Sequence, residues 1–302
     1  MKMQAGSRQL QAGSRQLQAG SGSACCLLAA ACLLLLATAL RLFRLDAQDI
    51  WGDEAFSIWL SQQPLSAVVA GAADTHPPFY PLLLLCWLKI AGLHAFATRA
   101  LSAFIGVLAV PLIFVFAKRL VPTRSRVAWL AAILAAVSPL LIYYSQETLM
   151  YELVAALAPA SAYFCLTLFP TPGKVHLGRG ESIRGLCGAG YFISTLLAIY
   201  THYSAFFVVA AENLFFVLRW WKNRHIFGAL LLRDWVVSQA CLIAAYVPLI
   251  IVQSSFLRGK ASARFDEWGW RGIEMIFGKT FLAFSVGLTM DYPFAQIATA
   301  VF

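Results

Sequence analysis

The sequence predicts an all-α, polytopic membrane protein. Of its 302 residues, 60% are hydrophobic and only 12% are charged, and the mean hydropathy is +0.72. Soluble domains carry about 25% charged residues, so this chain has too few charges for a water-soluble surface. Apolar runs recur along it at roughly the 20 residues that a helix needs to cross the hydrocarbon core of a bilayer.

The apolar runs predict about eight spanning helices in this chain. The first run ends near Arg41 and Arg44, not at a small-residue cleavage site, so we interpret it as an anchor and not as a cleaved signal peptide. The preceding Gly/Ser-rich stretch repeats residues 4–10 as 11–17, which predicts a disordered cytoplasmic tail over residues 1–23. We predict spans at 24–43, 99–117, 127–143, 152–169, 187–200, 204–218, 235–254 and 276–290.

Residues 44–98, between the first two spans, are predicted to be an extracytoplasmic loop with interfacial helices. Its apolar part, from Tyr80 to Leu93, would make roughly 21 Å of helix against a hydrocarbon core of about 30 Å. If this part does not cross, four stretches that hold 14 of the 23 Lys and Arg residues lie on one side: 1–23, 118–126, 170–186 and 219–234. Positive charges gather on the cytoplasmic side of membrane proteins. Residues 24–302 are therefore expected to form one transmembrane domain whose acidic loops face the opposite side.

Asp53 and Glu54 are the pair on which we expect the chemistry to depend. They are the only adjacent carboxylates in the first half of the chain. Neighbours on a helix point about 100° apart, so one would act on a substrate while the other orients it or pairs with a cation. Burial raises the pKa of a carboxyl group and a nearby arginine lowers it, which is how a general base is tuned. Further polar clusters occupy the same predicted face: His76, Arg99, Tyr144–Glu147 and Tyr200–Tyr203.

Four motifs between residues 51 and 151 occur in a characteristic order. They read W-x-D-E, H-P-P-F-Y, R-x-x-S-A and S-P-x-x-x-Y-Y-S-Q-E-x-x-M-Y. In combination they resemble the membrane-embedded glycosyltransferases of the C-type fold, specifically the family-39-like enzymes related to protein O-mannosyltransferases and lipid A aminoarabinose transferases. Leu149 departs from the pattern, because that family often has arginine there. Members of the family are also longer, so we expect this chain to be truncated at its C-terminus.

The resemblance implies a transferase that moves a sugar from a polyprenyl-phosphate donor to an acceptor hydroxyl. It implies a bacterial plasma-membrane location with the active face extracytoplasmic, and the donor and the bilayer as partners. Asp53 would be the general base, and Glu54 would orient it or pair with a cation. Arg99 would be the first phosphate contact. The expected substrate-binding residues are His76, Arg99, Tyr144, Gln146, Glu147, Tyr151 and His202.

Other ligands and functions were weighed against this one. A divalent metal could accompany the phosphate near Asp53, although no ligand spacing calls for one. The net charge of +9 does not indicate nucleic acid, because the basic residues sit in short loops between apolar runs. A lipid or solute transporter and an inactive or partial relative stay open as alternatives. Glu212 lies inside a span, where it could bond to a neighbouring helix or be protonated.

Overall fold

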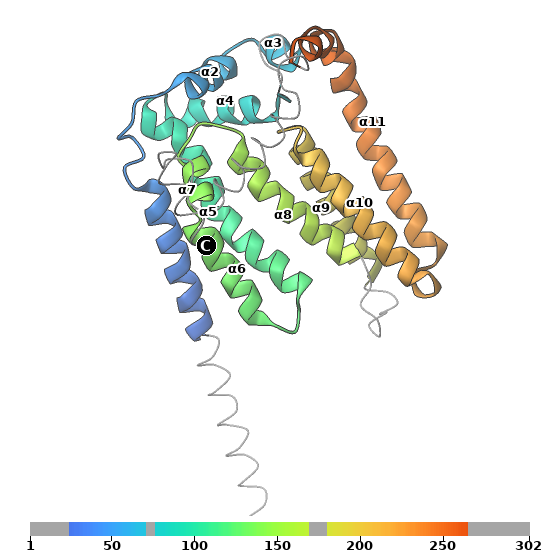
Figure 1. Ribbon diagram of the computed structural model, residues 1–302. Coiled ribbons are helices and arrows are strands. Elements are labelled where there is room, and N and C mark those ends of the chain that lie inside the picture. The colour runs from blue at the N-terminus through green and yellow to red at the C-terminus, as the bar shows by residue number, and fades with distance from the viewer. Residues whose placement is uncertain (1–23, 71–75, 169–179, 265–302) are drawn as a thin grey trace, which may run out of the picture.

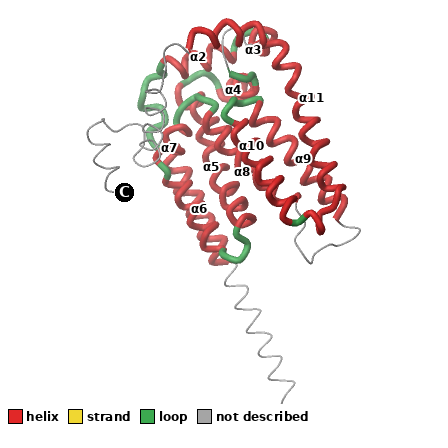
Figure 2. The backbone as a smooth tube through the Cα atoms, turned by 45° about the vertical axis from the view of Figure 1, so that its right-hand side comes forward, coloured by secondary structure: helices red, strands yellow, loops and turns green. Residues whose placement is uncertain are grey.

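The computed structural model describes residues 24–70, 76–168 and 180–264. Within these ranges it describes the side chains of all residues except 70, 180–184, 224–230 and 254–264. Every regular element in the described ranges is a helix (Figure 2). The predicted tail at 1–23 and the predicted span at 276–290 lie outside the described residues.

A bundle of helices makes up the body of the protein, and short helices lie across one of its ends (Figure 1). The short helices are α2 (Gly52–Ser61), α3 (Leu65–Ala70) and α4 (Phe79–Ala91). α4 lies along the end of the bundle rather than through it. The bundle consists of the N-terminal helix (Ala24–Leu42), α5 (Ala95–Leu120), α6 (Ser125–Val137), α7 (Pro139–Ser145), α8 (Tyr151–Leu168), α9 (Gly180–Ile199), α10 (Ala205–Lys222) and α11 (Arg224–Arg264).

The protein is an integral, multi-pass membrane protein, as the sequence predicts, but the count of eight spans is not confirmed. Four described helices are long and apolar enough to cross a membrane, or five if the bent pair α6–α7 counts as one span. α9 offers a shorter apolar stretch, Gly185–Ile199. α10 fits less well because it carries three charged residues, Glu212, Arg219 and Lys222.

The bend between α6 and α7 follows directly from its sequence. The two helices meet at 53°. Pro139 begins α7, and the residue before a proline is pushed out of the helical region, so Ser138 is extended with φ −61° and ψ 120°. Its hydroxyl then accepts a hydrogen bond from the Leu141 N–H at 3.4 Å and caps α7. The bend directs α7 toward the end of the bundle that α2 and α4 cover (Figure 1).

α5 is the central helix of the half of the bundle that carries the short helices. Much of its surface is made of buried small residues: Ala97, Ala100, Ser102, Ala103, Gly106 and Ala109. Small residues let membrane helices approach closely. α4 is tied to the start of α5, because Trp87 Nε1 donates to the Ala97 carbonyl at 2.7 Å. An apolar cluster that includes Tyr80, Leu84 and Leu153 joins α4, α5 and α8.

The other half of the bundle is held by side-chain hydrogen bonds between helices. Asn213 of α10 donates to Gln239 Oε1 of α11 at 3.1 Å and accepts from Trp235 Nε1 of α11 at 3.0 Å. Gln239 in turn donates to the hydroxyl of Tyr191 in α9 at 3.1 Å. Deeper in the same half, Glu212 Oε1 accepts from Ser161 Oγ of α8 at 2.7 Å.

We expect Asn213→Leu to loosen the contact between α10 and α11. The change removes two interhelical hydrogen bonds, each worth roughly 0.5–1.5 kcal/mol, so the loss should be about 1–3 kcal/mol. Thermal unfolding of the purified protein measures it. Asn223→Leu is the control, because the Asn223 amide donates to a carbonyl of its own helix. An equal loss in both variants would contradict this role.

Candidate active site

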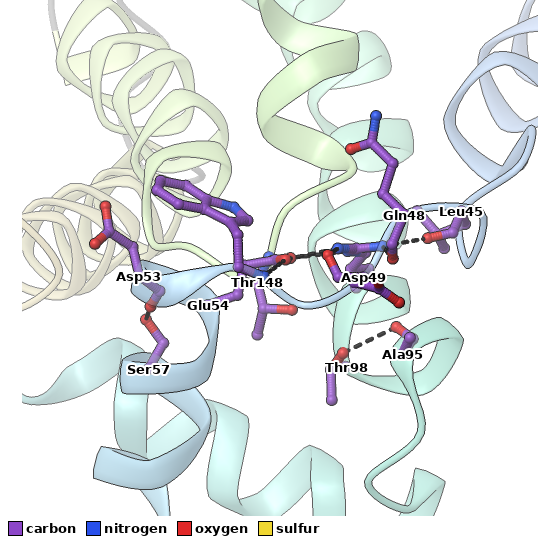
Figure 3. Close-up of polar contacts among 11 residues, drawn as sticks. Leu45, Gln48, Asp49, Asp53, Glu54, Ser57, Ala95, Thr98 and Thr148 are labelled. Atoms are coloured by element: carbon purple, nitrogen blue, oxygen red, sulfur yellow. Dashed lines mark hydrogen bonds and ion pairs between the residues drawn. The ribbon is translucent and has the colours of Figure 1, made fainter.

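A buried ion pair between Glu54 and Arg99 organises the end of the bundle beneath α2 (Figure 3). Arg99 Nε donates to Glu54 Oε1 at 2.8 Å, and Arg99 Nη2 donates to Glu54 Oε2 at 2.6 Å. Glu54 Oε1 also accepts from the Thr148 N–H at 2.9 Å, and Oε2 from the Trp51 N–H at 3.4 Å. The carboxylate thus joins the first loop to α5 and to the turn that precedes α8.

The guanidinium of Arg99 has no free donor left for another ligand. Besides its two bonds to Glu54, it donates to the backbone carbonyls of Leu45, Gln48 and Asp49 at 2.8–3.1 Å. Arginine carries five N–H groups in a fixed fork, and all five point at these acceptors. A phosphate at Arg99 would therefore have to displace one of them.

Asp53 lies on the other side of the same helical turn. Its side chain is exposed, whereas that of Glu54 is buried. Figure 3 shows the Asp53 carboxylate directed away from the contact between Glu54 and Thr148. The division agrees with the roughly 100° between neighbouring helical residues. Asp53 is therefore the carboxylate of the pair that a ligand can reach.

Four of the predicted substrate residues form a continuous row of aromatic rings at this end of the bundle. The rings of His76 and His202 stack with centroids 5.1 Å apart. His202 lies 5.5 Å from Tyr151, which lies 4.8 Å from Tyr144. The Phe79 N–H donates to the Tyr200 carbonyl at 2.9 Å and holds the His76 segment against the turn after α9. Aromatic faces and imidazole nitrogens suit a polar, ring-shaped ligand such as a sugar.

Electrostatics separate the two glutamates of the site. Burial alone would raise the pKa of Glu54, but the hydrogen bonds from Arg99 and Thr148 and the arginine charge outweigh it and hold that pKa below its usual 4.5. Burial raises the pKa of Glu147, and the charges of Glu54 and Asp53 add to this effect although Tyr143 donates a hydrogen bond to it. The pKa values of the two glutamates are thus shifted in opposite directions, that of Glu54 downward and that of Glu147 upward.

Gln146 lies apart from the aromatic row. Its Nε2 donates to the carbonyls of Leu40, Arg41 and Phe43 at 3.1–3.3 Å. These are carbonyls at the C-terminal end of the N-terminal helix, where a helix has no N–H donors of its own to offer them. In this structure Gln146 acts as a cap. Its predicted contact with substrate would need that cap to open.

The Leu149 departure also has a structural setting. Leu149 is buried in the apolar cluster with Tyr80, Leu84 and Leu153. Its carbonyl accepts from Ser102 Oγ at 3.4 Å, and Ser102 lies 3.5 Å from the Tyr80 hydroxyl. The serine of the R-x-x-S-A motif thus connects the tyrosine of H-P-P-F-Y to the last motif. The four motifs meet in one place although they are spread over a hundred residues.

The described residues do not form a complete metal site by themselves. Within the described part of the chain, no three His, Cys, Asp or Glu side chains come together in a way that could hold a metal ion. Both oxygens of Glu54 are already occupied by Arg99 and by backbone N–H groups. Asp53 and Glu147 are the remaining carboxylates, and Mg²⁺ is usually bound by one or two carboxylates together with substrate phosphates and water.

Sequence reasoning missed three components of the site. The Thr148 N–H binds Glu54 through its backbone, which carries no signal in the side-chain pattern. Arg41 and Glu152 are both completely buried in helices next to the site. A charged residue inside an apolar run is a functional candidate by default, and this signal was available for both.

An all-helical membrane bundle with interfacial helices across one end, the first of which carries an acidic pair, is the arrangement that the C-type glycosyltransferase fold predicts. The sequence profile described as dolichyl-phosphate-mannose-protein mannosyltransferase matches residues 75–243. This is more than half of the chain, and the chain belongs to that family. The match confirms the resemblance drawn from the four motifs.

Two solved structures share the fold. The S. cerevisiae protein O-mannosyltransferase Pmt1-Pmt2 complex bound to the sugar donor is 18% identical, with a TM-score of 0.59 over 74% of this chain and 33% of that chain. ArnT from Cupriavidus metallidurans in the apo state is 16% identical, with a TM-score of 0.55 over 83% of this chain and 45% of that chain. The chain thus spans less than half of either relative. A comparison with curated protein sequences found no match.

We expect Glu54→Gln to destabilise the fold by roughly 3–5 kcal/mol at pH 7, because it leaves the buried Arg99 charge unpaired. Because the pKa of Glu54 is lowered in the folded protein, its ionised form stabilises the fold at pH values above its usual pKa of 4.5. This stabilisation is lost as the pH falls through the lowered pKa. The difference between wild type and variant should therefore shrink at acid pH. Thermal unfolding at pH 7 and at pH 4 measures it.

Glu147→Gln is the matched control for this experiment. The raised pKa of Glu147 means that its ionised form costs stability as the pH rises, so its amide should be neutral or stabilising at pH 7. A loss in Glu147→Gln as large as that in Glu54→Gln would refute the electrostatic assignment.

Proposed function

We propose that this protein transfers a sugar from a polyprenyl-phosphate donor to an acceptor hydroxyl, with Asp53 as the general base, on the extracytoplasmic face. The proposal rests on one observation, namely that the two acidic residues of the pair lie in different environments. Glu54 is buried and fixed by Arg99, whereas the side chain of the adjacent Asp53 is exposed. Membership of the family supports a lipid-linked sugar as the donor class.

Asp53 suits the removal of a proton from an incoming hydroxyl. It sits in the first turn of α2, where the helix dipole favours a negative charge. Its position on a rigid turn, held from beneath by Glu54, fixes the direction from which the acceptor would approach. The hydroxyl oxygen would attack the anomeric carbon as the bond to the lipid phosphate breaks, the proton would pass to Asp53, and the configuration at that carbon would invert. Base catalysis of this kind contributes roughly 10²–10⁴-fold.

The leaving lipid phosphate needs positive charge or hydrogen-bond donors more than it needs a proton. Arg99 is committed to Glu54 and to three carbonyls, so we assign it to holding the site and not first to the phosphate. Three basic residues at the end of α11 are further candidates by their charge: Arg258, Lys260 and Arg264, whose side chains lie outside the described set. The stacked rings of His76 and His202 supply further donors at the same end of the bundle.

An apolar cavity beside the aromatic row offers a place for the lipid tail. It has a volume of about 230 Å³. It lies next to the backbone bond between Phe79 and Tyr200 that fixes the His76 segment. Its lining includes Phe79 and Leu82 of α4, Tyr200, and Pro248, Leu249 and Val252 of α11. An isoprenoid chain in this cavity would leave its phosphate near the polar end of the bundle.

The first test compares wild type with Asp53→Asn in membranes supplied with labelled polyprenyl-phosphate sugars. The substitution keeps the size of the side chain and removes the base. We expect donor consumption to fall by about two orders of magnitude or more at equal protein level. Asp46→Asn is the control, because Asp46 is another exposed acid of the same loop. If Asp53→Asn consumes donor at the wild-type rate, Asp53 is not the base.

The second test fills the apolar cavity with Val252→Trp. A larger side chain there should compete with the lipid tail, so KM should rise about tenfold for a long-chain donor, the equivalent of about 1.4 kcal/mol. A donor with a tail too short to reach the cavity should show an unchanged KM. Equal effects on the two donors would place the tail elsewhere.

A further inference from the structure

Arg41 is a completely buried charge that joins the N-terminal helix to the bend between α6 and α7. It donates from Nη1 to the Ala136 carbonyl at 3.1 Å and from Nη2 to the Ala135 carbonyl at 3.1 Å. In a continuous helix the Ala135 carbonyl would accept from residue 139, but Pro139 has no N–H. Arg41 thus satisfies acceptors that the bend leaves open.

A second capping interaction joins the same two parts of the chain, with the donor and acceptor sides exchanged. Gln146, at the C-terminal end of α7, donates to three carbonyls at the end of the N-terminal helix. The N-terminal helix therefore caps α6, and the residue that ends α7 caps the N-terminal helix. The bent segment is held at both of its ends.

Glu152, in the first turn of α8, faces the Arg41 side chain across α5. A Cβ atom built on Gly106 would lie 2.7 Å from Arg41 Nε and 2.7 Å from Glu152 Oε1, so these two atoms lie within twice that distance of each other. Both side chains are completely buried. Among the described residues, neither Arg41 Nε nor either Glu152 oxygen has a hydrogen-bond partner. Arg41 and Glu152 therefore interact electrostatically, and each can partly neutralise the buried charge of the other.

We propose that Arg41 and Glu152, brought together over Gly106, are positioning residues for the active site. Together with Gln146 they enclose the segment from 145 to 152. That segment supplies the Thr148 N–H that binds Glu54, and also Glu147 and Tyr151. A shift of the segment would move the aromatic row relative to Asp53 without removing any group that contacts substrate.

The test compares wild type with Glu152→Gln, both purified in lipid nanodiscs, and measures amide hydrogen exchange over residues 145–152 together with donor turnover. We expect exchange in this segment to become about tenfold faster, because the opening of the segment becomes less costly. We expect kcat to fall roughly 10–100-fold while KM for the donor stays within about threefold, since misplacement by about 1 Å can cost 10²-fold.

The control is Glu212→Gln, which neutralises the other buried carboxyl of the bundle. Glu212 bonds to Ser161 on the far side of α8, so this variant should leave exchange at 145–152 as in wild type. If Glu152→Gln lowers only the amount of folded protein, with turnover per folded molecule and exchange unchanged, its role is merely structural and the proposal is wrong.

A double variant covers the case in which Glu152→Gln does not fold. Arg41→Met with Glu152→Leu removes both buried charges at once and leaves no unpaired ion. If Glu152 acts through Arg41, the double variant exchanges and turns over no worse than Arg41→Met alone. Additive losses would overturn the coupling.

Gly106→Ala tests the same arrangement without changing a charge. Its new methyl group would meet Arg41 Nε and Glu152 Oε1 at 2.7 Å and Ser145 Cβ at 2.8 Å. It should reproduce the faster exchange at 145–152. Gly190→Ala is the control, because its methyl group would meet only the Phe164 ring in α8, at 2.6 Å. The turnover readout rests on the proposed function, whereas the exchange readout does not, so an inactive wild type would count against the function and leave the positioning proposal to be decided by exchange.

Discussion

The contact between Glu54 and Arg99 is what gives the first loop a fixed position over the bundle. Buried ion pairs often contribute little net stability, because removing two charges from water is costly. Here that cost is offset by four hydrogen bonds to the carboxylate and by three backbone carbonyls on the guanidinium. The benefit is specificity of arrangement. Because Asp53 is adjacent to Glu54 in α2, fixing the position of Glu54 also fixes that of Asp53. The two side chains point in different directions.

The positions of the turns between the helices determine which other residues come together at the site. The turns after the N-terminal helix, after α7 and after α9 all reach the end of the bundle that α2 and α4 cover (Figure 1). The basic residues of the loops after α5 and α10 lie at the opposite end. Because α4 lies along the end of the bundle, the histidine that precedes it can stack on the histidine between α9 and α10. Chain topology therefore assembles an aromatic site from segments more than a hundred residues apart.

Most of the residues that meet at the candidate site could be predicted from the sequence, but the contacts that they make could not. The W-x-D-E, H-P-P-F-Y and Y-Y-S-Q-E motifs marked the right segments because polar groups in an apolar chain stand out. A sequence shows the charge of Arg99 and the amide of Gln146 but not the backbone carbonyls to which both donate. The predicted contacts of Arg99 with phosphate and of Gln146 with substrate stay predictions. Four or five of the eight predicted spans are supported by the described helices, because α9 offers only a short apolar stretch and α10 carries three charges. The predicted span at 276–290 lies outside the described residues.

The cap that Gln146 places on the N-terminal helix has a consequence for how the chain is made. The carbonyls at the end of that helix must wait for a side chain about a hundred residues later in the sequence. Chains are synthesised from the N-terminus at about 5–20 residues per second, so the first helix enters the bilayer many seconds before its end can be sealed. Until then, those carbonyls depend on water at the membrane surface. The N-terminal helix is thus inserted before α7 has been made, and its C-terminal end can be capped only after α7 is in place.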